Sequence, residues 1–72
     1  MTDRELLDEK IRLSGKKKGY LAKAVGMSRQ TFNKRCLNEG EFTTEQVKIL
    51  CKELNITTLE EREAIFFAQD VA

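Results

Sequence analysis

The sequence predicts an all-α fold, a single domain of five short helices that spans residues 1–72. The chain contains no proline and only four glycines, and 35% of its residues are charged, which favours helices with solvated outer faces over paired strands. Apolar residues recur at three- and four-residue spacings between capping and turn residues. A chain this short buries only about 60% of its unfolded surface, so a compact bundle with a small core is expected.

The first helix is expected over residues 3–13. Thr2 and Glu5 have the capping-box spacing, in which a hydroxyl group and a carboxylate three positions later bond to free backbone N–H groups. Gly15 ends the helical pattern. The predicted apolar stripe of this helix, with the residues that widen it, consists of Leu6, Leu7, Ile11, Leu13 and Ser14.

Three lysines precede the second helix, which is expected over residues 18–25: Lys16, Lys17 and Lys18. A helix start prefers Ser, Thr, Asp or Asn, and cations there oppose the positive end of the helix macrodipole. Such a conflict between local preference and fold tends to mark function. A phosphate held between the ammonium groups and the free backbone amides would resolve it, so the sequence predicts a phosphate site here.

A tight turn is expected between the second helix and a third helix over residues 29–36. Gly26 can take a left-handed conformation at low cost, and Ser28 can cap the third helix. Met27 and Phe32 occupy the two positions of a hydrophobic staple. This arrangement is typical of a helix-turn-helix. The residues expected to face the core from the third helix are Phe32, Cys36 and Leu37.

The outer face of the third helix is predicted to carry Arg29, Gln30, Asn33, Lys34 and Arg35, which can bond to base edges or phosphates. Residues 10–37 contain nine Lys and Arg and no Asp or Glu, whereas the rest of the chain holds four positive and twelve negative residues. A segment this basic attracts phosphate, and the acidic remainder would orient the protein toward a polyanion. The alternative is a solvated helix face with unequal charges.

The start of the fourth helix is strongly specified, after a loop over residues 38–41. Thr43 and Gln46 form a second capping box, and Phe42 and Val47 form a second staple. The apolar stripe that follows consists of Val47, Leu50, Cys51 and Leu54. Asn55 is expected to end this helix in a left-handed conformation, with Ile56 as its apolar follower.

A fifth helix is expected to start at about residue 59, because Thr57 and Thr58 precede Glu60 and Glu61 in another capping-box pattern. The final apolar cluster, which is less regular, consists of Ile65, Phe66, Phe67, Ala68 and Val71. Residues 65–67 could instead form a short extended segment. Part of the cluster must reach the core, and the remainder could be exposed for a partner.

The composition argues against several classes of protein. Cys36 and Cys51 are expected to pack as free thiols, although a disulfide stays possible from the residues alone. Histidine is absent, so no metal or other cofactor is expected, and neither an enzyme nor a small-molecule substrate is indicated. No apolar run approaches the roughly 20 residues of a membrane span, and the N-terminus is too polar for a signal peptide, so a soluble, cytoplasmic protein is expected.

A family resemblance rests on the residues of this turn: Leu21, Ala22, Val25, Gly26, Met27, Ser28 and Phe32. Their spacing resembles the helix-turn-helix of lambda-repressor-like regulators, the XRE and Cro group. Residues 37–56 resemble the loop and fourth helix of those domains, and with residues 65–71 the chain looks most like a small phage or prophage regulator. The resemblance implies a five-helix domain that binds double-stranded DNA and regulates transcription, with residues 29–36 in the major groove.

The resemblance and the outward-facing positions together give the predicted site. The residues expected to read base edges are Arg29, Gln30, Asn33 and Lys34. The residues expected to contact phosphates are Lys16, Lys17, Lys18, Ser28, Thr31, Arg35 and Asn38. The chain departs from the family pattern at Lys17, which replaces a polar cap, and at Arg35, whose position is usually apolar.

A homodimer is expected, since domains of this type usually bind two half-sites about one helical turn apart. The residues predicted to form its interface are Ile65, Phe66, Phe67 and Val71. The alternative function is a small protein-interaction module, an adaptor or anti-repressor, that uses the same C-terminal apolar segment. The acidic C-terminal half is compatible with that role.

Overall fold

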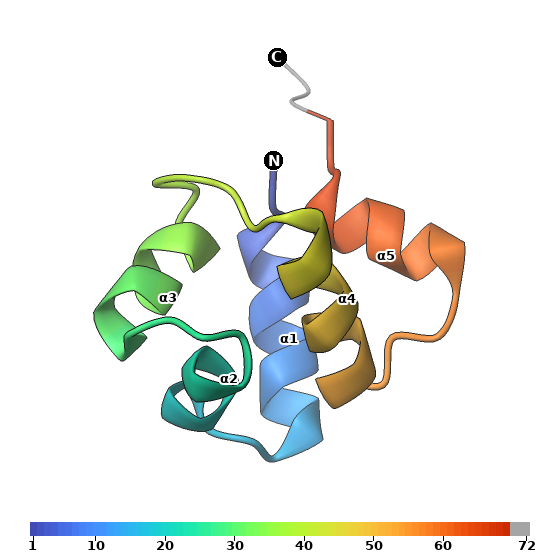
Figure 1. The fold of residues 1–72 in the computed structure, drawn as a ribbon. Helices are drawn as coiled ribbons and strands as arrows, with labels where there is room; N and C mark the ends of the chain where they lie inside the picture. Colours follow the sequence, from blue (N-terminus) through green and yellow to red (C-terminus); the bar gives the residue numbers. More distant parts are fainter. Residues whose placement is uncertain (70–72) are drawn as a thin grey trace.

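The computed structural model describes residues 1–69, which form five helices and no strand, so the predicted all-α class is confirmed for this part of the chain (Figure 1). The helices are α1 (Arg4–Ser14), α2 (Lys18–Ala24), α3 (Arg29–Cys36), α4 (Thr44–Glu53) and α5 (Leu59–Phe66). Helix α2 packs against α3 and α4, and α1 packs against α5. In Figure 1, α3 and α5 lie on opposite sides of α1 and α4.

Side-chain caps begin four of the five helices. Ser28 and Thr58 accept backbone N–H groups at the starts of α3 and α5, and Thr43 and Gln46 form the predicted reciprocal box at α4. The expectation for α1 was wrong by one residue, because Asp3 caps the helix by accepting the N–H of Leu6. Helix α2 begins at Lys18, and its N-cap residue Lys17 provides no side-chain cap, as the sequence predicted.

Three helices end in the same way, with a left-handed residue after the C-cap. These residues are Gly26 after α2, Asn38 after α3 and Asn55 after α4. In each case the next residue donates its N–H to a carbonyl five positions back, which is the pattern of a Schellman motif. Gly26 and Asn55 were predicted in this role, whereas Asn38 was predicted to lie in a loop and to contact phosphate.

The core contains one apolar side of every helix. Phe42 joins two of them, since its ring centroid lies 5.7 Å from that of Phe32 and 6.0 Å from that of Phe66. The buried apolar residues are Leu7, Ile11, Leu21, Ala22, Val25, Phe32, Cys36, Val47, Leu50, Leu54, Ile56, Ile65 and Phe66. Three predicted core residues are exposed instead: Leu6, Leu13 and Leu37. They flank the buried face of their helices, so they remain at the solvent boundary.

The C-terminal apolar cluster is mostly part of this core. Ile65 and Phe66 are 1% and 5% exposed, so in the monomer neither residue offers surface for the predicted dimer interface. Phe67 is 47% exposed, and Val71 lies outside the described residues. Because α5 continues to Phe66, the extended alternative for residues 65–67 is wrong.

Candidate nucleic-acid interface

The first turn of α3 presents two polar side chains to solvent. Arg29 and Gln30 are both exposed, directly after the capping residue Ser28. On the opposite side of the helix Phe32 is fully buried, which fixes the orientation of α3 on the rest of the domain. The backbone that carries Arg29 and Gln30 is therefore held by both a cap and a core anchor.

The other residues predicted on the outer face of α3 differ in exposure. Lys34 is exposed, whereas Asn33 is half-buried and lines a surface hollow between α1 and α3, together with Asp8 and Lys18. Thr31 is half-buried, and its hydroxyl oxygen accepts a hydrogen bond of 3.0 Å from the Ser28 hydroxyl. Thr31 retains its own hydroxyl proton for a further acceptor.

An open hollow of about 490 Å³ lies between the start of α2 and the start of α3. Its lining residues are Ile11, Lys16, Lys17, Lys18, Gly19, Tyr20 and Arg29. The structure thus brings the predicted phosphate-binding lysines and the first predicted base-reading residue, Arg29, to one surface, although separate roles were predicted for them. Of its four cations, Lys16 and Lys18 pair with carboxylates, so Lys17 and Arg29 are the ones that favour an anion there.

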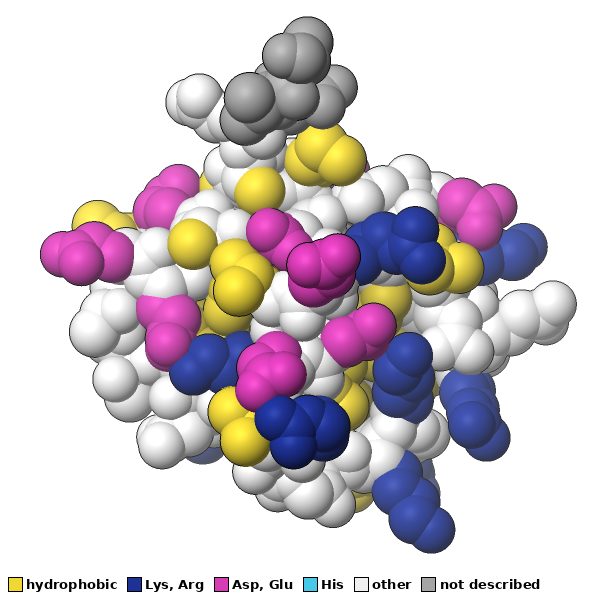
Figure 2. All heavy atoms as spheres, turned by 180° about the vertical axis from the view of Figure 1, so that it is seen from behind, with side chains coloured by type: hydrophobic (Ala, Val, Ile, Leu, Met, Phe, Trp, Pro, Cys, Tyr) yellow, Lys and Arg dark blue, Asp and Glu magenta, His cyan; other side chains and the backbone are white. Residues whose placement is uncertain are grey.

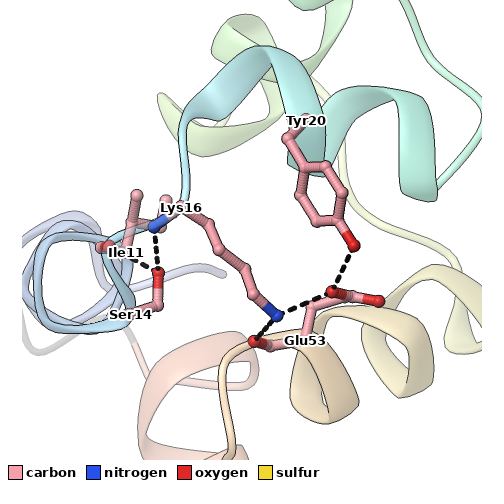
Figure 3. Close-up of polar contacts among 5 residues, drawn as sticks. All are labelled: Ile11, Ser14, Lys16, Tyr20 and Glu53. Atoms are coloured by element: carbon pink, nitrogen blue, oxygen red, sulfur yellow. Dashed lines mark hydrogen bonds and ion pairs between the residues drawn. The ribbon is translucent and has the colours of Figure 1, made fainter.

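Lys16 lines this hollow, but its ammonium group is directed to α4 (Figure 3). Its Nζ donates to the backbone carbonyl of Glu53 at 2.7 Å and to Glu53 Oε1 at 2.8 Å. The Tyr20 hydroxyl donates to the same Oε1 at 3.1 Å, and the ring of Tyr20 lies beneath Lys16 Nζ. Hydrogen bonds from Lys16 and then from Tyr20 lower the pKa of the Glu53 carboxyl.

Two other predicted phosphate-binding residues also bond within the protein. The Arg35 guanidinium donates to the backbone carbonyl of Glu39 at 2.8 Å and lies against Gly40. The Asn38 side chain exchanges two hydrogen bonds with the backbone of Thr2. Together with Lys16, these residues are committed to holding loops, so they are not free in this structure to reach a phosphate.

The charge segregation seen in the sequence becomes sharper in the fold. Four of the nine cations in residues 10–37 pair with carboxylates: Lys10 with Glu61, Arg12 with Glu9, Lys16 with Glu53 and Lys18 with Asp8. The other five have no described carboxylate within 4.0 Å, and they are Lys17, Lys23, Arg29, Lys34 and Arg35. All five lie on α2, on α3 or at the start of α2.

The surface view agrees with this distribution. On the face shown in Figure 2, most Lys and Arg lie toward the side that carries α2 and α3 and most Asp and Glu toward the middle and the opposite side, where some of them adjoin Lys or Arg. Lys23, an exposed member of the unpaired set, was missed in the predicted site, although its place in the acid-free segment was a usable signal. Tyr20 was also missed, because its partner Glu53 is 33 residues away and leaves no local pattern.

Comparison with known proteins does not place the chain in a family. No family model matches the sequence, and searches of curated proteins and of solved structures return no match. Over residues 1–69, no helix has the length and apolar character needed to cross a membrane. Within the same residues, no three His, Cys, Asp or Glu side chains are grouped so that they could hold a metal ion.

Proposed function

We propose that this protein is a sequence-specific regulator of transcription that binds double-stranded DNA through a Cro/repressor-like helix-turn-helix formed by α2 and α3. The observation that carries the proposal is the exposed first turn of α3 together with four cations that have no described carboxylate within 4.0 Å and no described bond to a loop: Lys17, Lys23, Arg29 and Lys34. An α-helix fits the major groove, and cations on either side of it neutralise the phosphates of the two strands.

The exposed residues divide into two roles by their chemistry. Arg29 can donate two hydrogen bonds to guanine, and Gln30 can exchange two with adenine, each pair contributing about 1–3 kcal/mol of discrimination against a wrong base. Lys17, Lys23 and Lys34 supply attraction to phosphates that is independent of sequence. Asn33 and Thr31 lie at the edges of the same surface, where partial burial restricts them to contacts close to the helix.

Selection of bound duplexes from a random pool tests the proposal directly. We expect a defined sequence preference, and Arg29→Ala or Gln30→Ala should relax it at single positions by about 1–3 kcal/mol. Lys17→Ala and Lys34→Ala should weaken selected and scrambled duplexes alike and reduce the slope of log Kd against log salt by about one. Lys52→Ala is the matched control, because Lys52 is an exposed cation on α4 without a described carboxylate partner.

Two results would contradict the proposal. A selected pool without sequence preference would show that the protein does not recognise a specific sequence. Equal losses of duplex affinity for Lys52→Ala and Lys17→Ala would show that the DNA-binding surface is wrongly assigned. A protein-interaction module is the weaker reading, because Ile65 and Phe66 of its proposed surface are buried in the core of the monomer.

A further inference from the structure

The first residues of the chain form a strap between two distant parts of the fold. Residues 1–3, the N-terminal strap, lie between the α3–α4 connection and the end of α5 (Figure 1). On one side, the N–H of Asp3 donates to the carbonyl of Ile65 at 2.7 Å, and Ala68 donates to the carbonyl of Met1 at 2.9 Å. The strap is therefore fixed to α5 by backbone hydrogen bonds on both sides of Thr2.

On its other side the strap bonds to one side chain. The N–H of Thr2 donates to Asn38 Oδ1 at 2.8 Å, and Asn38 Nδ2 donates to the carbonyl of Thr2 at 2.9 Å. Thr2 is only 6% exposed and Asn38 is half-buried, so this pair of hydrogen bonds is partly shielded from competing water. Asn38 is also the left-handed residue that ends α3, with a φ of 65°. The amide thus fixes the C-terminal end of α3 to the strap.

We propose that Asn38 is a positioning residue for α3. The expected effect on DNA binding rests on the proposed function, whereas the effect on the position of the helix does not. The strap, which is bonded to α5, fixes the C-terminal end of α3, while the Ser28 cap and the buried Phe32 fix its N-terminal half. Loss of the Thr2–Asn38 pair leaves the chemical identity of the exposed side chains on α3 unchanged, but it lets the helix that carries them shift. A shift of this kind reduces discrimination between duplexes, since base contacts depend on position more than phosphate contacts do.

The chain offers a matched control for removing this amide. Asn55 ends α4 with a φ of 57° and the same pattern of backbone hydrogen bonds, but it is exposed and forms no described side-chain hydrogen bond. Glycine accepts a positive φ, so Asn38→Gly and Asn55→Gly make the same backbone change. Only Asn38→Gly removes a tertiary contact. Thr2→Pro removes the N–H donor from the other side and leaves Asn38 intact.

The first measurement needs no DNA. In amide spectra of the free protein, Asn38→Gly and Thr2→Pro should each shift resonances of residues 29–37, and the double variant should add little to either single change. Asn55→Gly should leave those resonances unmoved. Unmoved α3 resonances in Asn38→Gly would overturn the positioning role, whether or not the protein binds DNA. If Thr2→Pro does not fold, Asn38→Asp replaces it, because the carboxylate keeps the acceptor for Thr2 N–H but loses the donor to the Thr2 carbonyl, so it too should shift these resonances.

The second measurement uses duplexes and separates this role from a direct phosphate contact. Under the positioning role, Asn38→Gly should lower affinity for a selected duplex about tenfold and change a scrambled duplex much less, since tenfold corresponds to roughly the net contribution of one hydrogen bond. Thr2→Pro should give the same pattern. Equal losses on both duplexes for Asn38→Gly, with none for Thr2→Pro, would overturn the proposal in favour of a phosphate contact. Failure of the wild type to bind any duplex would refute the proposed function and leave the spectra to decide the role of Asn38.

Discussion

Lys16 and Glu53 are 37 residues apart in sequence, and the ammonium group of Lys16 bonds to both the backbone carbonyl and the carboxylate of Glu53. Glu53 is the last residue of α4, where a cation also complements the negative end of the helix macrodipole. The contact ties the α1–α2 connection to α4 and so fixes the place from which Lys17 and α2 begin. A lysine in a basic run thereby acts as a structural residue.

Stability should depend on pH through Glu53. Its pKa is lowered from the ordinary 4.5, chiefly by the hydrogen bond from Lys16 and next by that from Tyr20. Its contribution to the free energy of unfolding is complete above 4.5 and is lost as the pH falls through the depressed value of the folded state. Glu53→Gln should therefore be less stable than the wild type near pH 7, and in urea titrations the difference should shrink as the pH is taken well below 4.5.

Glu45→Gln is the control for that titration, because Glu45 pairs with Lys48 at 3.9 Å on the open surface. Its difference from the wild type should be small at both pH values. A Glu53→Gln difference that stays constant from neutral to acidic pH would show that the hydrogen bonds do not act on the ionised carboxylate.

Replacement of Lys17 by a capping residue should raise the stability of the fold and weaken binding to duplex DNA. Lys17 is the N-cap residue of α2, with the extended backbone that Ser and Asp also adopt there, but it provides no cap. Lys17→Ser and Lys17→Asp should raise the free energy of unfolding by about 1 kcal/mol. Both should weaken binding to duplexes, Lys17→Asp more strongly because it also adds a negative charge beside the hollow.

Thermal unfolding and duplex titration on the same samples measure both effects. Thr43→Ala is the control in the opposite direction, since it removes an existing cap on α4. It should lower the free energy of unfolding by about 1 kcal/mol without changing the affinity of the folded protein for DNA. Stabilisation by Lys17→Ser with unchanged affinity for DNA would assign Lys17 no part in binding.

Phe66 and Phe67 should respond in opposite ways to a charge. Phe66 is in the core beside Phe42, so Phe66→Glu should abolish cooperative unfolding. Phe67 is exposed, so Phe67→Glu should fold, and if the expected homodimer forms through it, sedimentation should show weaker association for this variant. A monomeric wild type with unchanged cooperative binding of Phe67→Glu to DNA would remove Phe67 from any dimer interface.

The two thiols should differ in reactivity. Burial raises the pKa of Cys36 from 9.0 to about 11, which lowers its thiolate population about a hundredfold at neutral pH, and burial raises the pKa of half-buried Cys51 as well. In single-cysteine variants, a thiol reagent should label Cys51 before Cys36 in the folded protein. Equal rates are expected in denaturant, and equal rates without it would mean that α3 opens readily.

Local features of this fold were predictable, and long-range ones were not. The capping box at Thr43 and the left-handed Asn55 involve neighbours within a few residues, so the sequence shows them directly. The start of α1 was misplaced because Thr2 and Asp3 are both good caps, and the sequence does not show that the backbone of Thr2 bonds to the Asn38 side chain instead. An apolar pattern also does not distinguish a core residue from one at its edge, as Leu13 shows.

In the candidate site, too, the features set by neighbouring residues were predictable and those set by distant residues were not. The exposure of Arg29 and Gln30 follows from the cap and the apolar positions on either side. The structural roles of Lys16 and Asn38 depend on partners 37 and 36 residues away, which no local pattern reveals. The composition indicated a basic segment, and only the fold shows which of its cations are neutralised.

The separation of unpaired cations on α2 and α3 from the carboxylates elsewhere has a practical consequence for handling the protein. With a net charge of +1 at pH 7, the molecule as a whole is nearly neutral. Each side nevertheless presents a local concentration of charge to a resin that it contacts. Retention on ion exchangers should therefore depend on the charge of the contacting side and not on the net charge. Near neutral pH and at low salt, the same preparation should adsorb to both cation- and anion-exchange resins, in opposite orientations.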